Sequence, residues 1–181
     1  MSGADRWTST SMPYVTPRAE GQGDAWAEEA AARGREGTQR ILFAGEVPAA
    51  EEPAALLGLA AGEPVVVRRR IIELDGRPCE LTDTYYPVGI ARGTPLAATA
   101  KIRGGAAALL ARLGHTGSRV IEDVTAGLPT PEERDRLELA SGQPVLRLAR
   151  QILDARDRPI QADLMTMPAH DQRLRYEMRI G

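Results

Sequence analysis

Two arginines on one apolar strand are the residues of this sequence best suited to binding chemistry. Arg68 and Arg70 lie two positions apart within the apolar run 65–74, so their side chains are expected on the same side of the strand. Two guanidinium groups on a buried surface cost free energy unless an acid or a ligand pairs with them. Their planar forks fit a carboxylate, a phosphate or a dense set of hydroxyls. The pattern therefore indicates an anion-binding or oxygen-binding site.

Two other interpretations of these arginines stay open. In the first, they form ion pairs with internal acids, for which Asp83, Glu122 and Asp163 are the candidates. In the second, they lie near a sheet edge and extend their guanidinium groups into solvent. Neither of these interpretations requires a ligand.

An internal repeat of 80 residues indicates which side of the strand is buried. Gly62-Glu63-Pro64-Val65 returns as Gly142-Gln143-Pro144-Val145, and Arg70 returns as Arg150. In the second copy the even-numbered positions are apolar apart from Arg150 itself. The same pattern in the first copy places both Arg68 and Arg70 on the buried side.

The length of the repeat also predicts the architecture. A unit of 80 residues is too long for a solenoid repeat and too short for an independent domain of ordinary size. Two half-domains that share one core are expected, and such folds often place a ligand between the halves. Apolar periodicity predicts the order helix, strand, helix, strand, strand twice, at 25–33, 38–46, 51–57, 65–74 and 79–86, and at 105–113, 119–126, 131–137, 145–153 and 160–167.

The remaining segments complete this arrangement. Strict alternation of apolar residues over 173–180 predicts a half-buried closing strand. Residues 1–23 show no helical period and are expected to form an extended or disordered arm, followed by one domain over 24–181. Because most connections are short, the chain is expected to form an α+β fold with an antiparallel sheet covered by helices.

Composition and motifs exclude several classes of protein. A net charge of −2 without a basic stripe argues against direct nucleic-acid binding. The single Cys79 excludes an intramolecular disulfide and, with the isolated His115 and His170, supplies no metal cluster. No apolar run reaches the roughly 18–20 residues of a membrane span, and no catalytic or cofactor motif occurs. We expect a cytoplasmic protein without a metal, a cofactor or an assembled catalytic set.

Several short segments, in their order and spacing, resemble a known family. They are Leu57-Gly58-Leu59, Gly62 through Arg70, Asp75-Gly76-Arg77-Pro78, Tyr86-Pro87, Gly142-x-Pro144-Val145-Leu146, Arg150 and Arg175-Tyr176. Together they are similar to the UTRA domain, the effector-binding half of bacterial GntR-type regulators of the HutC subfamily. The resemblance extends over about 24–181.

This resemblance implies a chorismate-lyase-like α+β fold with a duplicated helix and strand unit around a six-stranded antiparallel sheet. It also implies a homodimer that binds a small metabolite, such as a sugar phosphate, a urocanate-type acid or an alkylphosphonate. The family's anion-binding arginines match Arg68 and Arg70, its partner-strand polar residue matches Thr82, and its C-terminal tyrosine matches Tyr176. With three further polar or helix-start positions, the expected effector contacts are Arg68, Arg70, Thr82, Thr84, Gly105, Asp163 and Tyr176.

Departures from the family pattern leave the effector open. Gly105 and Ala107 stand where sugar-phosphate binders carry hydroxyl groups that contact phosphate, so a carboxylate or a bulkier ligand is equally compatible. A winged-helix module needs about 60–70 residues, and only 23 precede Asp24. DNA contact is therefore expected only through another domain.

Two alternative functions remain. One is a chorismate-lyase-like enzyme that eliminates pyruvate, for which Asp163 is the available acid. The other is an interaction module that partners a separate DNA-binding regulator through a sheet edge.

Overall fold

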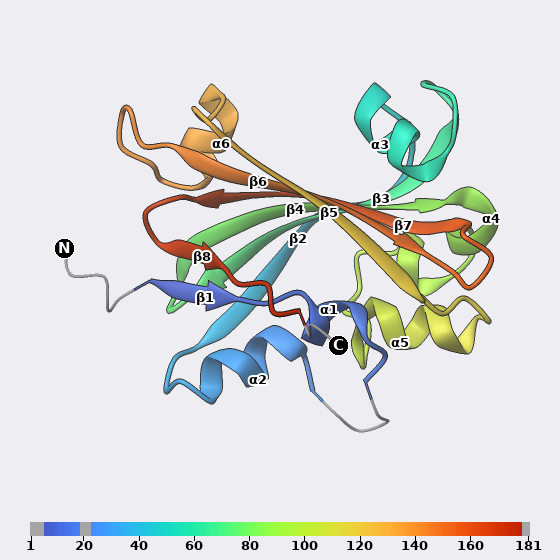
Figure 1. Cartoon of the computed structure of the whole chain (residues 1–181), viewed down its shortest axis with the longest axis horizontal. Coiled ribbons are helices and arrows are strands. Elements are labelled where there is room, and N and C mark those ends of the chain that lie inside the picture. The colour runs from blue at the N-terminus through green and yellow to red at the C-terminus, as the bar shows by residue number, and fades with distance from the viewer. Residues whose placement is uncertain (1–5, 19–22, 179–181) are drawn as a thin grey trace.

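The structure is a computed structural model that describes residues 6–18 and 23–178 of the 181-residue chain (Figure 1). In chain order its elements are β1 (Trp7–Ser9), α1 (Met12–Val15), α2 (Ala25–Ala31), β2 (Gly37–Pro48), α3 (Glu51–Leu57), β3 (Pro64–Leu74), β4 (Arg77–Pro87), α4 (Val88–Ala91), the 3₁₀ helix η1 (Pro95–Ala97), α5 (Gly105–Arg112), β5 (Arg119–Gly127), α6 (Pro131–Arg136), β6 (Val145–Leu153), β7 (Pro159–Pro168) and β8 (Gln172–Leu174).

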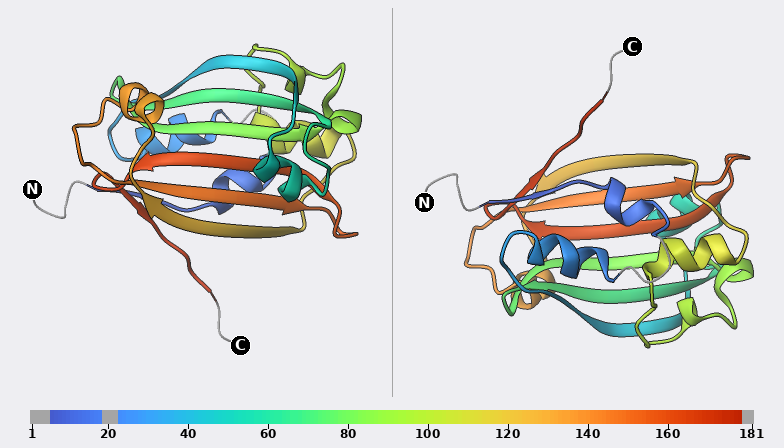
Figure 2. Two further views of the ribbon diagram at one scale, coloured as in Figure 1. Left: turned by 90° about the horizontal axis from the view of Figure 1, so that it is seen from above. Right: turned by 90° about the horizontal axis from the view of Figure 1, so that it is seen from below.

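Six strands form one antiparallel sheet in the order β2-β3-β4-β7-β6-β5. The first half-domain contributes β2, β3 and β4, the second contributes β5, β6 and β7, and the two halves meet where β4 pairs with β7. Helices α3 and α6 cover one face of the sheet, and α1, α2 and α5 lie on the other (Figures 1 and 2). The predicted duplicated α+β fold with a six-stranded sheet is confirmed.

Both faces of β3 are buried over its first part, which explains the three consecutive valines Val65–Val67. Val65 and Val67 pack with Leu57 of α3 on one face, while Val66 packs with Leu110 of α5 on the other. The turn from β3 to β4 has Asp75 at φ 51° and Gly76 at φ 73°, as a two-residue hairpin with inverted turn geometry requires. Local sequence thus specifies the hairpin, and the two helical layers hold it in place.

The start of α6 is stabilised by a complete capping box. The Thr130 hydroxyl accepts from the Glu133 amide at 3.2 Å, and the Glu133 carboxylate accepts from the Thr130 amide at 2.7 Å. We expect Thr130→Ala to lower the free energy of unfolding by about 1 kcal/mol because the cap's side-chain acceptor is lost. Urea denaturation measures this. Thr130→Ser keeps the hydroxyl and should stay close to wild type; equal losses in the two variants would contradict the prediction.

The N-terminal segment, for which the sequence predicts an extended or disordered arm, contains a short strand and a short helix. Within residues 6–18, β1 pairs in parallel with β8, and Trp7 is only 5% exposed. Its ring meets that of Trp26 edge to face at a centroid distance of 4.9 Å. Packing of the Trp7 ring against α2 anchors this segment to the rest of the fold. Local periodicity in the sequence could not indicate this contact, because the two residues lie far apart in the chain. Residues 1–5 and 19–22 of the predicted arm lie outside the described residues.

The predicted closing strand over 173–180 is mostly wrong. Only Gln172–Leu174 forms a strand, β8, and it pairs with β1 rather than with the main sheet. Both edges of β7 are already paired, with β4 and β6, so the chain leaving β7 cannot extend the sheet beside it. Residues 175–178 form no regular structure and are exposed, and 179–180 lie outside the described residues.

No helix in the described part of the chain is long and apolar enough to span a membrane.

Candidate functional site

A cavity of about 430 Å³ is lined by residues of the sheet together with residues of α2 and α5. The N-terminal segment, the start of α2 and residues 101–107 form its walls, and β3, β4 and β7 contribute its floor. Most of the residues predicted from the sequence line it, namely Arg68, Arg70, Thr82, Thr84, Gly105 and Asp163. The fold therefore brings these six residues together around one partly enclosed cavity.

Tyr176, the remaining predicted residue, does not line the cavity. Tyr176 is 52% exposed. Strand β8 ends at Leu174, so Tyr176 lies beyond the two-stranded sheet that β8 forms with β1. Partial burial, followed by the nearby carboxylate of Glu122, raises the pKa of Tyr176 to about 12. The structure thus associates Tyr176 with Glu122 on β5 and not with the cavity.

Arg150 is neutralised from both sides by acids on the neighbouring strands. It pairs across the sheet with Glu122 on β5 and Asp163 on β7. Its Nε donates to Glu122 Oε1 at 2.6 Å, and its Nη1 lies 3.6 Å from Asp163 Oδ2. Burial alone would raise the pKa of Glu122, but hydrogen bonds from Ser11 and the attraction of Arg150 outweigh it and lower that pKa. All three charged side chains are nearly inaccessible, at 4–8% exposure.

Arg70 occupies the equivalent position in the first half-domain and has neutral neighbours instead. Across the sheet it faces Ile41 on β2 and Thr82 on β4. Its Nη2 donates to Thr84 Oγ1 at 2.9 Å and its Nη1 to Gln39 Oε1 at 3.4 Å, while its buried Nε has no partner in the described structure. No acid among the described residues lies within ion-pair distance of Arg70. Of the two duplicated arginines, this one retains an uncompensated charge at the cavity.

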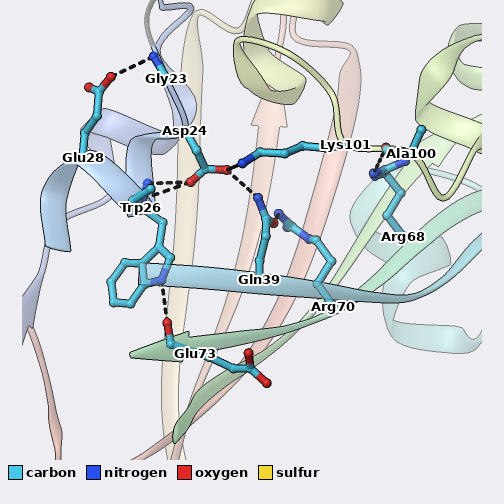
Figure 3. Close-up of polar contacts among 11 residues, drawn as sticks. Gly23, Asp24, Trp26, Glu28, Gln39, Arg68, Arg70, Glu73, Ala100 and Lys101 are labelled. Carbon is cyan, nitrogen blue, oxygen red and sulfur yellow. Dashed lines mark hydrogen bonds and ion pairs between the residues drawn. The ribbon is translucent and has the colours of Figure 1, made fainter. Parts of the chain in front are cut away.

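Gln39 connects Arg70 to the start of α2 (Figure 3). Its amide nitrogen donates to Asp24, whose other carboxylate oxygen accepts from the amides of Trp26 and Ala27 at 3.0 and 3.2 Å. The Nζ of Lys101 lies 3.9 Å from the same Asp24. A second, weakly paired cation therefore reaches the cavity from the loop before α5.

Arg68 has a different environment from Arg70 although the two share a strand face. Its guanidinium donates to four main-chain carbonyls of the segment around η1, those of Pro95, Leu96, Ala98 and Ala100. Burial lowers the pKa of Arg68, and the neighbouring Arg70 adds to this effect. The side chain borders the cavity, but its charge stabilises the adjoining loop.

Glu80 lines the cavity and was missed by the sequence analysis. It lies opposite Ile72, is partly buried and accepts a hydrogen bond from the Thr82 hydroxyl. No ionic partner for it occurs among the described residues. Burial raises the pKa of Glu80, against the opposing effects of Thr82, Arg70 and Arg150. Strand parity with Thr82 was the signal that could have identified it.

The raised pKa makes Glu80 a destabilising residue at neutral pH. When folding raises the pKa of a carboxyl, the folded state binds the proton more tightly than the unfolded state. Stability is therefore highest below the ordinary glutamate pKa of about 4.3 and falls as the pH rises through the higher, folded value. Glu80→Gln keeps an acceptor for Thr82 without a charge, so we expect a higher melting temperature than wild type at pH 8. Scanning calorimetry should show the difference shrinking toward pH 4; a difference constant with pH would contradict this cause.

Among the described residues, no three His, Cys, Asp or Glu side chains are grouped in a way that could hold a metal ion.

A duplicated antiparallel sheet with helices on both faces defines the chorismate-lyase-like class of α+β domains. More narrowly, the chain belongs to the UTRA domain family, whose model matches residues 32–173. No curated protein sequence matches it significantly.

Solved structures share the fold. The effector domain of PhnF from Mycobacterium smegmatis is 22% identical, with a TM-score of 0.71 over 91% of this chain and 99% of that one. The ligand-binding domain of a protein described as a GntR-family transcriptional regulator from Bordetella bronchiseptica is 26% identical, with a TM-score of 0.69 over 80% and 91%. The C-terminal domain of the histidine utilization repressor from Pseudomonas syringae pv. tomato is 19% identical, with a TM-score of 0.62 over 80% and 100%.

Proposed function

We propose that this chain is the effector-sensing domain of a GntR-type transcriptional regulator and that it binds an anionic or polar metabolite in the cavity. Membership in the UTRA family and the regulatory relatives support this proposal. The observation that carries it is the contrast between Arg150, which has two acids beside it, and Arg70, which has none among the described residues.

In this proposal an anionic group of the ligand balances the charge of Arg70, as Glu122 and Asp163 balance the charge of Arg150. A charge that must otherwise rely on neutral hydrogen-bond partners gains a charge-assisted pair inside a partly enclosed space, where such pairs are strong. Lys101, 3.9 Å from Asp24, is close enough to the cavity to add attraction for the same anion. The arrangement favours a carboxylate or phosphate over a neutral ligand.

The other residues have distinct parts in the proposed site. Thr82 and Thr84 supply hydroxyl groups on the cavity floor. Gly104 and Gly105 have φ of 76° and 81°, a conformation that favours glycine and leaves the backbone at the start of α5 uncovered. Arg68 shapes the cavity wall, and Asp163 holds Arg150 in place.

A melting-shift screen against carboxylates and phosphorylated metabolites tests the proposal. Saturation at about 100 times the dissociation constant should add about 2.7 kcal/mol to the free energy of unfolding. Arg70→Gln should abolish the stabilisation, whereas Arg69→Gln should retain it because Arg69 points to the opposite face and pairs with Asp83 at 3.2 Å. An unchanged shift in the Arg70 variant would place the ligand elsewhere.

An enzymatic function on the same fold receives less support. A chorismate-lyase-like elimination needs an acid free to assist departure of the product. Asp163 accepts hydrogen bonds from Gln161 at 2.9 and 3.0 Å and lies next to Arg150, so it serves a structural network. Formation of 4-hydroxybenzoate from chorismate, followed by absorbance, would favour the enzyme.

We also propose that the domain forms homodimers and affects DNA only through another domain. Edge strand β5 exposes Val120, Ile121 and Val124 by 37–44%, an apolar edge that invites pairing. Antiparallel pairing of two copies about Ile121 would place Arg119 opposite Asp123 of the other copy. Sedimentation should show a dimer that Ile121→Lys dissociates; a dimer unaffected by this change would use another surface, and a monomeric wild type would refute self-association.

A further inference from the structure

We propose that the ligand is amphoteric: it presents an anionic group to Arg70 and an ammonium group to Glu80, as an amino acid does. This inference rests on the proposed function of the cavity and specifies the chemical class of its ligand. It follows from how the two half-domains distribute charge over equivalent positions of the sheet.

In the second half-domain these positions form a self-contained set. Gln161 donates to both carboxylate oxygens of Asp163, and Asp163 in turn lies 3.6 Å from Arg150. The Gln161 amide therefore donates to the Asp163 carboxylate, and the Arg150 guanidinium balances the charge of that carboxylate. Nothing in this set requires a ligand.

In the first half-domain the acid and the arginine are separated. Glu80 takes the position of Gln161, Thr82 that of Asp163, and Arg70 that of Arg150. The Thr82 hydroxyl donates to Glu80, and Arg70 lies across the sheet from Thr82. Strand spacings place the α-carbons of Arg70 and Glu80 about 8 Å apart, and no ion pair joins them. Arg70 and Glu80 therefore both border the cavity without forming an ion pair with each other.

The surroundings of Glu80 favour a donor over a second anion. Its charged and titratable neighbours are Arg70, Arg150, Asp163, the adjacent buried thiol of Cys79 and Tyr14. Arg150 is already neutralised by two acids, and Asp163 repels a further negative charge. A partly buried carboxyl with one hydroxyl donor gains most from a cationic partner that donates several hydrogen bonds.

The apolar residues that line the cavity suit an apolar body between the two charges. Ile41, Ile72 and Met165 line it together with Trp26. A volume of about 430 Å³ accommodates a side chain up to aromatic size. A ligand with a carboxylate, an ammonium group and an apolar side chain would satisfy all three surfaces.

Calorimetric titration of the whole chain with matched ligands tests this inference. The probes are the proteinogenic amino acids and, for phenylalanine and leucine, the same body without the amine (3-phenylpropanoate, 4-methylpentanoate) or without the carboxylate (phenethylamine, isoamylamine). We expect at least one amino acid to bind; for phenylalanine or leucine, either analogue should bind at least tenfold more weakly. For any amino acid that binds, Glu80→Gln should weaken affinity at least tenfold, as should Arg70→Gln, whereas Asp83→Asn on the opposite face should not.

Three outcomes would overturn the inference. They are an amine-free analogue that binds as tightly as its amino acid, an unchanged affinity in a folded Glu80→Gln variant, and no binding by any amino acid. If carboxylates or phosphates still bind in an Arg70-dependent manner, only the amphoteric class is refuted and the proposed anion site stands. Loss of all Arg70-dependent binding would instead refute the proposed function. Thermal melts of each variant verify that it is folded.

Discussion

Replacing Arg150 by Gln should lower the free energy of unfolding by about 3–5 kcal/mol, the usual cost of removing one partner from a buried ion pair. The guanidinium is the ionic partner of both Glu122 and Asp163. Without it, two carboxylates remain in a nearly inaccessible layer of the sheet and must be either charged and unpaired or protonated. Urea denaturation at pH 7 measures the loss.

Arg70→Gln is the matched control, since it changes the equivalent residue of the other half-domain. Arg70 donates hydrogen bonds only to the neutral acceptors Gln39 and Thr84. Because its loss breaks no ion pair, we expect a change of at most about 1 kcal/mol. Equal losses in the two variants would contradict the assignment of Arg150 to structure and Arg70 to binding.

The same reasoning predicts a pH dependence for the Arg150 network. The pKa of Glu122 is lowered in the folded state, so its stabilising contribution is present above the ordinary glutamate pKa of about 4.3 and is lost as the pH falls through the lower, folded value. Arg150→Gln removes the attraction that lowers this pKa. The difference in stability between wild type and variant should therefore narrow in acid, and a difference that widens there would be inconsistent with an ion pair.

Replacing Arg68 by Met should destabilise the chain by about 2–4 kcal/mol, because hydrogen bonds from a charged donor are lost and the carbonyls they satisfied are left without it. Those carbonyls belong to the segment around η1, which includes the fully buried Leu96. We expect the loss of structure to begin in this segment, before the rest of the domain unfolds. Hydrogen exchange should show reduced amide protection over 95–103.

Arg69→Met provides the comparison for Arg68. Arg69 is exposed and pairs with Asp83 on the other face, and exposed pairs contribute about 0–1 kcal/mol. If Arg68→Met left both stability and exchange over 95–103 unchanged, the guanidinium would not be supporting the loop and would be available to a ligand instead.

Three arginines that look alike in the sequence therefore have three roles in the structure. Arg150 pairs with two buried acids, Arg68 donates to main-chain carbonyls of a loop, and Arg70 has no ionic partner among the described residues. That both Arg68 and Arg70 contact an effector stays a prediction. The alternative in which Arg68 and Arg70 form ion pairs with Asp83, Glu122 or Asp163 is not seen in the described structure, where Asp83 pairs with Arg69 and the other two acids pair with Arg150.

The sequence by itself determined the duplication, the order of the helices and strands within the repeated unit and the inward direction of Arg68 and Arg70. These features follow from periodicity, capping and turn residues, which act over a few neighbouring positions and are repeated 80 residues later. Only the tertiary structure decided which arginine meets an acid, that Glu80 borders the cavity, that Trp7 packs on Trp26 and that Tyr176 leaves the sheet. Each of these depends on strand register or on contacts between segments far apart in the chain, because a buried charge is compensated by whatever residue the neighbouring strand places opposite it.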